Sequence, residues 1–74
     1  MEREEYLILI SARLNNARMR TGISLEKLAN MLDLSVLTVW RYMSGKNDIP
    51  SYYLMRMCEI FNISVDLFRW GDSI

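Results

Sequence analysis

The sequence predicts an all-α fold, a compact bundle of five short helices. Apolar residues recur at helical spacing, first at Leu7, Ile10, Leu14 and Ala17. No stretch of useful length alternates apolar and polar residues as a strand would. Seventy-four residues without a repeat, a low-complexity tract or a linker make a single domain, residues 1–74.

The first two helices meet near residues 21–24. The first helix is expected to end near Thr21 and Gly22, where its apolar stripe stops. Ser24 then caps a second helix, because its side chain can accept a hydrogen bond from the first turn. The side chains expected to face inward from the second helix are Leu28, Ala29 and Leu32.

A third helix is expected over residues 35–44, after a short turn. Ser35 can cap its start and Gly45 can end it. Asp33 stands where the turn needs positive φ, which Asp adopts more readily than most non-Gly residues. The inward side chains of this helix are expected to be Val39, Tyr42 and Met43.

Two further helices complete the predicted bundle. Pro50 and Ser51 are expected to open the fourth, since Pro fits a first turn, where its missing N–H costs nothing. Its apolar stripe contains Leu54, Met57, Cys58 and Phe61. Asn62 is expected to take a left-handed stop, and Ser64 to cap a last short helix that ends at Gly71.

The composition argues against catalysis and metal binding. The chain contains no His and a single Cys, Cys58, so it has neither an internal disulfide nor a zinc-ligand set. It also lacks a Gly-rich phosphate loop and a nucleophile–His pair. We therefore expect no enzyme, metal, cofactor or small-molecule ligand. The lone Cys, and the lack of an apolar run near the ~20 residues of a membrane span, predict a cytoplasmic protein without a membrane partner.

The charges balance overall but not locally. Nine Lys and Arg residues oppose nine Asp and Glu residues. Residues 10–47 nevertheless hold six basic side chains against two acidic ones, a net of +4 between two acidic ends. The basic residues of this segment are Arg13, Arg18, Arg20, Lys27, Arg41 and Lys46. They could offer one face to the phosphates of a nucleic acid, or they could simply solvate helix surfaces.

Residues 25–44 show a helix-turn-helix pattern. Two helices that cross closely need a small residue, which Ala29 supplies, and apolar contacts that lock one helix onto the other. Leu28, Leu32, Leu34 and Val39 are spaced for those contacts. In proteins with this motif the second helix enters the DNA major groove.

The chain resembles the phage-repressor and Cro-type (XRE-like) helix-turn-helix family over about residues 10–70. The motifs that carry the resemblance are "RTGIS", "KLANMLDLS", "TVWRYMSGK" and "IP…MCEIFNISVDLF". The resemblance implies a five-helix fold of the lambda-repressor type. It also implies a bacterial or phage transcription regulator, expected to be a repressor, that binds a double-stranded operator as a homodimer.

The resemblance also implies site residues. The base-facing set comprises Val36, Leu37, Thr38, Trp40 and Arg41. The phosphate-contacting set comprises Leu25 with its neighbouring backbone N–H groups, Ser35, Ser44 and Lys46. The chain departs from the family's pattern at two of its positions. Leu25 stands where the family often has a Gln that clamps a phosphate, and Met43 stands where it often has a Glu that pairs with the Arg at position 18. Arg18 is therefore expected to be solvated or paired elsewhere.

The apolar character of the expected reading face leaves two functions open. Apolar side chains can read thymine methyl groups, and Arg41 can bind guanine. Alternatively, Leu37 and Trp40 could bind a protein partner, because exposed apolar patches on small proteins mark interaction sites. For the homodimer, the expected contacts are Phe68 and Trp70 near the end of the chain.

Overall fold

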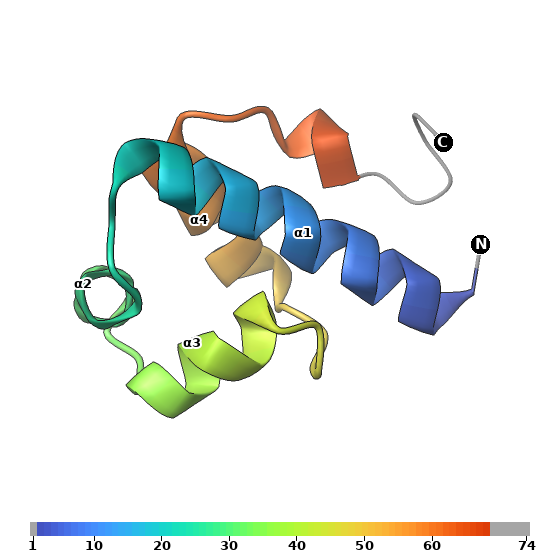
Figure 1. Ribbon diagram of the computed structural model, residues 1–74, viewed down its shortest axis with the longest axis horizontal. Coiled ribbons are helices and arrows are strands. Elements are labelled where there is room, and N and C mark those ends of the chain that lie inside the picture. Colours follow the sequence, from blue (N-terminus) through green and yellow to red (C-terminus); the bar gives the residue numbers. More distant parts are fainter. Residues whose placement is uncertain (1, 69–74) are drawn as a thin grey trace.

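The computed structural model describes residues 2–68, which form four α-helices and one short 3-10 helix (Figure 1). The elements are α1 (Arg3–Thr21), α2 (Leu25–Leu32), α3 (Val36–Met43), α4 (Ser51–Phe61) and η1 (Val65–Phe68). The all-α class is confirmed for these residues. The expected count of five α-helices is wrong, because the last element is a single 3-10 turn.

Serines cap the starts of three of these elements. Ser24 and Ser35 each accept a hydrogen bond from the backbone N–H three residues ahead, which is the N-cap geometry of an α-helix. Ser64 accepts from the N–H of Asp66, two residues ahead, which is the other N–H that an N-cap side chain can bind. The caps predicted at Ser24 and Ser35 are confirmed. Pro50 differs slightly from expectation, since it stands at the N-cap of α4, one residue before the first turn.

Three of the four α-helices end in the same motif, a left-handed residue followed by an apolar one. The left-handed residues are Gly22, Asp33 and Asn62, with φ of 74°, 57° and 56°. The residues that follow them, Ile23, Leu34 and Ile63, pack against the core, and each N–H bonds to the carbonyl five positions earlier. This is the Schellman arrangement, which satisfies carbonyls at the helix end. The left-handed conformations expected at Asp33 and Asn62 are confirmed.

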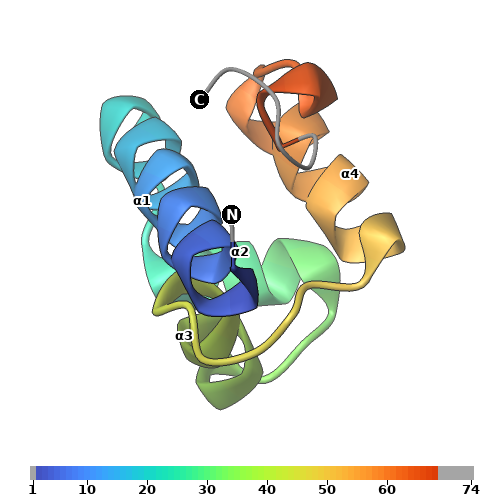
Figure 2. The same cartoon turned by 90° about the vertical axis from the view of Figure 1, so that its right-hand side faces the viewer.

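The helices surround one core, to which all four α-helices and η1 contribute side chains. In a view down the long axis of the molecule, α1 and α4 stand side by side and α3 lies below them (Figure 2). The packing contacts join α1 to α3 and α4, α2 to α3, and η1 to α4. The radius of gyration, 11.4 Å, matches the ~11 Å expected for a compact domain of this length.

The apolar stripes read from the sequence face this core. Leu14, Leu28, Val39 and Met57 have almost no exposed surface, and each comes from a different α-helix. Tyr42 and Leu54, also expected inside, are half-buried against the cluster. None of the helices in the described part of the chain is long and apolar enough to cross a lipid bilayer.

Phe68 belongs to the core and not to the surface. Only 4% of its area is exposed, and its backbone carbonyl accepts a hydrogen bond from the hydroxyl of Tyr6 on α1. The expectation that Phe68 presents its ring to a second copy is therefore wrong, because η1 turns the ring inward. Trp70, the other residue of that expectation, lies outside the described residues.

Candidate nucleic-acid interface

The rotation of α3 is fixed by its inner face. Val39 and Met43 are buried, and Tyr42 is half-buried with its ring centroid 6.4 Å from that of Tyr53 on α4. These contacts confirm the inward side expected for this helix. The opposite side chains of α3 consequently point to solvent.

A second set of contacts holds the C-terminal end of α3 against α1. The side-chain amide of Asn15 donates to the carbonyl of Met43 at 2.6 Å and to that of Ser11 at 2.9 Å. Gly45, just past the helix, lies so close to α1 that a Cβ there would stand 3.2 Å from Ser11 Oγ. Sequence reasoning missed Asn15; the signal was an amide directly beside the apolar stripe of α1.

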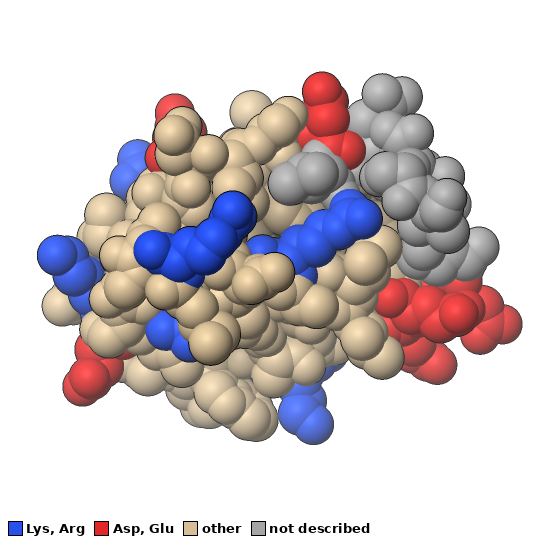
Figure 3. Space-filling view, turned by 45° about the horizontal axis from the view of Figure 1, so that its top comes forward, with Lys and Arg blue, Asp and Glu red and all other residues tan. Residues whose placement is uncertain are grey.

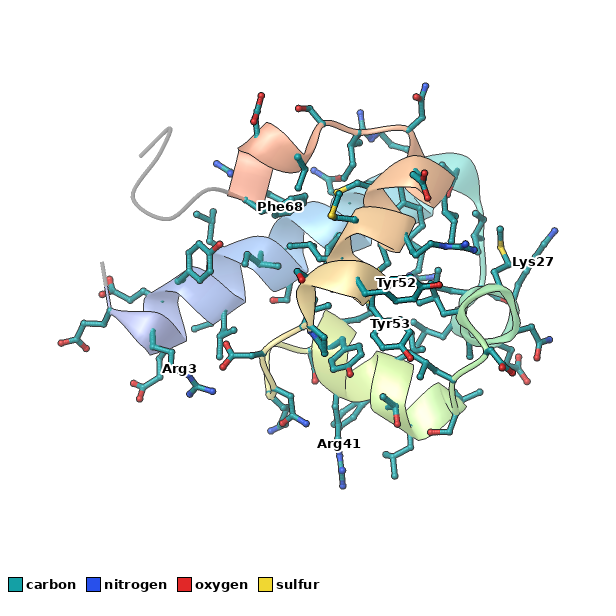
Figure 4. All side chains as sticks on the ribbon, turned by 180° about the vertical axis from the view of Figure 1, so that it is seen from behind. Arg3, Lys27, Arg41, Tyr52, Tyr53 and Phe68 are labelled. Carbon is teal, nitrogen blue, oxygen red and sulfur yellow. The ribbon has the colours of Figure 1, made fainter. Side chains whose placement is uncertain are left out.

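The outer face of α3 brings four of the five expected base-facing residues together. Val36, Leu37 and Trp40 are 44%, 56% and 45% exposed, which is high for large apolar side chains. Arg41 is also exposed and extends away from the body of the protein (Figure 4). Within the described part of the chain, Arg41 forms no ion pair.

Thr38, the fifth residue of that set, is engaged at the start of the helix. Its hydroxyl lies 2.8 Å from Ser35 Oγ, and its backbone N–H donates to the same oxygen at 3.1 Å. Thr38 is also only partly exposed. Its hydroxyl therefore supports the N-cap in this structure and does not stand alone on the outer face.

The expected phosphate-contacting residues lie at three different places. Ser35 and Ser44 flank α3 and are exposed, and Ser44 Oγ donates to the carbonyl of Arg41 at 3.2 Å. The predicted helix 35–44 is thus Val36–Met43 with these serines as its caps. Leu25 differs, since its side chain packs against the core. A phosphate contact there would have to come from backbone N–H groups.

The end of α3 departs from the other helix ends at Lys46. Gly45 is left-handed, with φ 77°, and the N–H of Lys46 bonds to the carbonyl of Arg41 at 3.0 Å, five residues earlier. The geometry matches the ends of α1, α2 and α4, but an exposed Lys stands where those have an apolar residue. The turn therefore presents a cation beside the outer face of α3.

The remaining basic side chains do not gather on that face. Several Lys and Arg side chains cross the side of the molecule seen from above α1, with acidic ones toward its edges (Figure 3). Lys27 and Arg41 project in different directions (Figure 4). Lys27 on α2 and Arg41 on α3 therefore do not share one face. That the basic middle segment offers one face to phosphates stays a prediction.

Arg18 bonds to a backbone carbonyl and to no acidic side chain among the described residues. Its Nη1 donates to the backbone carbonyl of Ile23 at 2.8 Å, across the turn between α1 and α2. Met43, where the resemblance would place a Glu, is buried. Of the two alternatives for Arg18, the structure thus shows pairing elsewhere. The side chain braces the turn.

Neither a metal-ligand group nor a relative identifies a function for this chain. The described residues contain no group of three or more His, Cys, Asp or Glu side chains that could hold a metal ion. Comparisons with protein-family models, with curated proteins and with solved structures found no match to this chain. A function is therefore inferred from the side chains of α3 and their surroundings.

Proposed function

We propose that the protein is a sequence-specific DNA-binding regulator of transcription, a repressor, in which α2 and α3 act as a helix-turn-helix. It is a binding protein and not an enzyme. The observation that carries the proposal is the outer face of α3, where Val36, Leu37, Trp40 and Arg41 are exposed on a helix whose other side is buried. A single α-helix fits the major groove of B-DNA.

The side chains of this face have complementary chemistry in the groove. The guanidinium of Arg41 can donate two hydrogen bonds to O6 and N7 of a guanine, while Leu37 and Trp40 can contact thymine methyl groups. Ser35 and Ser44 at the helix ends, and Lys46 beyond them, are placed to reach phosphate oxygens. In a two-fold dimer, the two α3 helices would occupy half-sites about 34 Å apart, one turn of the duplex.

A protein-binding role is the second candidate, because three of the four exposed side chains on this face are apolar. Exposed apolar clusters mark protein interfaces as well as nucleic-acid surfaces. In that case Trp40 would be the anchor, since Trp is enriched among residues that dominate binding energy at interfaces. The two candidates predict opposite rankings for Arg41 and Trp40.

The test is a fluorescence titration with mixed duplex DNA at two salt concentrations, followed by selection of a preferred site. If phosphates are contacted, log affinity falls by about 0.9 per contacted phosphate for each unit of log salt. With two exposed cations near α3, we expect a shallower slope than in strongly basic repressors. An affinity for duplex DNA that does not change with salt concentration, or no binding at low salt, would contradict the proposal.

Substitutions then separate the two candidates on the selected site. Arg41→Ala should lose about 1–3 kcal/mol and relax preference at one base pair, whereas Lys46→Ala should weaken all sequences alike. Arg20→Ala, the same change at an exposed position on α1, is the matched control. Trp40→Ala should still fold, because Trp40 is 45% exposed. If Trp40→Ala abolishes capture of a protein while Arg41→Ala changes nothing, the protein-binding role is correct.

A further inference from the structure

A second exposed surface lies on α4, away from the core. Tyr52, Met55, Arg56 and Glu59 stand at steps of three, one and three residues, so they share one face of the helix. Tyr52 and Met55 are 64% and 57% exposed, whereas Met57, Cys58 and Phe61 on the other side of α4 are buried. We name these four residues the outer face of α4.

This face is continuous and hollowed. Its four side chains line a cavity of about 240 Å³. Tyr52 extends from the first turn of α4 toward α2 (Figure 4), and Arg56 Nη2 lies 3.5 Å from the carbonyl of Met31 at the end of α2. By contrast, Ile8 and Met19, the large exposed apolar residues of α1, stand eleven positions apart, roughly 16 Å along the helix.

The charges of the outer face are only loosely paired among the described residues. Arg56 Nε and Glu59 Oε1 are 4.0 Å apart, at the limit of an ion pair, and their side chains are 41% and 76% exposed. A partner that presents an acid opposite Arg56 and a base opposite Glu59 would neutralise both. A second outer face of α4, rotated by 180° so that its helix runs in the opposite direction, presents its charges in that order.

We propose that the outer face of α4 binds a second copy of this chain, with the two α4 helices antiparallel. A two-fold axis perpendicular to the helices, at the height of the midpoint between residues 57 and 58, places Arg56 of each copy opposite Glu59 of the other. Met55 then lies beside Ile60 of the second copy, which is only half-buried within its own chain. Parallel helices would instead set Arg56 against Arg56 and Glu59 against Glu59, so charge selects the antiparallel pair.

The size of this surface sets the strength of the dimer. One face of an eleven-residue helix covers less than the ~800 Å² per partner of a standard protein interface. We therefore expect self-association that depends on concentration in the micromolar to millimolar range. The inference does not depend on DNA binding, because it uses α4 and leaves the outer face of α3 uncovered.

Analytical ultracentrifugation of the 74-residue chain and of two charge-reversed variants tests the pairing. R56E carries Glu at both positions and E59R carries Arg at both. Each variant alone should therefore form a weaker dimer, with a dissociation constant about tenfold or more above that of the parent. An equimolar mixture should restore a one-to-one heterodimer, because every cross-chain contact then joins opposite charges. The double variant R56E/E59R reverses both charges and should self-associate like the parent.

Ile8→Glu is the control, since it adds an acidic group at an equally exposed apolar position on α1 and should leave association unchanged. Circular dichroism of each variant checks that it folds. If one of the single variants fails to fold, the self-association of the double variant decides the outcome. A parent that remains monomeric at millimolar concentration would overturn the proposal. So would a parent that dimerises while the mixture, or the double variant, does not.

Discussion

Gly22 and Gly45 have nearly the same backbone conformation but different surroundings. Both are left-handed, with φ of 74° and 77°. Nothing lies within 4 Å of the place a Cβ would take at Gly22, whereas at Gly45 it would stand 3.2 Å from Ser11 Oγ and 3.3 Å from the carbonyl oxygen of Leu7. Gly45 therefore permits both a left-handed turn and the close approach of that turn to α1.

The two glycines give a matched pair of substitutions. Gly22→Ala should lower the free energy of unfolding by about 1 kcal/mol, the cost of placing an L-residue in the left-handed region. Gly45→Ala should lose about 1 kcal/mol more, because the added methyl group meets α1. Urea unfolding followed by circular dichroism measures both. Equal losses would mean that α1 yields to the methyl group without cost.

At the scale of elements, α3 depends on its neighbours. An isolated eight-residue helix is unstable in water, so α3 is held by tertiary contacts and by its caps. Its buried side chains fix the rotation, and Asn15 of α1 fixes its C-terminal end through the carbonyl of Met43. The surface that α3 offers to a ligand is therefore set partly by a residue of another helix.

Asn15 and Asn16 test this dependence. Asn15→Ala removes the side-chain amide that donates to the Met43 carbonyl and should cost about 1–2 kcal/mol of stability. It should also speed amide hydrogen exchange in the last turn of α3. Asn16→Ala, at the exposed neighbouring position, should stay within about 0.5 kcal/mol of the parent. Identical exchange rates in the two variants would remove Asn15 from the account of how α3 is held.

On the scale of the whole molecule, stability rests on one shared core. The four side chains with almost no exposure, Leu14, Leu28, Val39 and Met57, come one from each α-helix. No helix can therefore leave without opening the core, and we expect cooperative, two-state unfolding. Cys58 is buried in the same cluster as a free thiol, and this burial raises its pKa above the ordinary value of 9.0.

Because the thiol ionises more readily in the unfolded chain than in the core, the stability it provides is complete below pH 9 and lost as pH rises above it. The difference in unfolding free energy between the parent and Cys58→Ala should therefore shrink as pH is raised from 8 toward 10.5. Urea unfolding of both proteins across this range measures it. The comparison isolates Cys58, because the two proteins share every other side chain. Parallel pH curves would show that the Cys58 thiol ionises equally in both states.

The sequence by itself determined the helices, their caps and their inward faces. Ser24, Ser35, Asp33 and Asn62 act within a few residues of the chain, and the period of the apolar stripes marks the buried side of each helix. The exposure of Val36, Leu37, Trp40 and Arg41 followed from the same period, since the buried side of α3 defines the opposite one.

The tertiary structure alone decided which elements meet. It joined the hydroxyl of Tyr6 to the carbonyl of Phe68, gave Arg18 the carbonyl of Ile23, and pointed Lys27 and Arg41 in different directions (Figure 4). It also brought Asn15 to the end of α3, and placed the outer face of α4 beside Met31 of α2. Hydrophobic periodicity and capping are local and can be read along the chain. Contacts between residues far apart depend on how the helices pack around the common core, which no local pattern specifies.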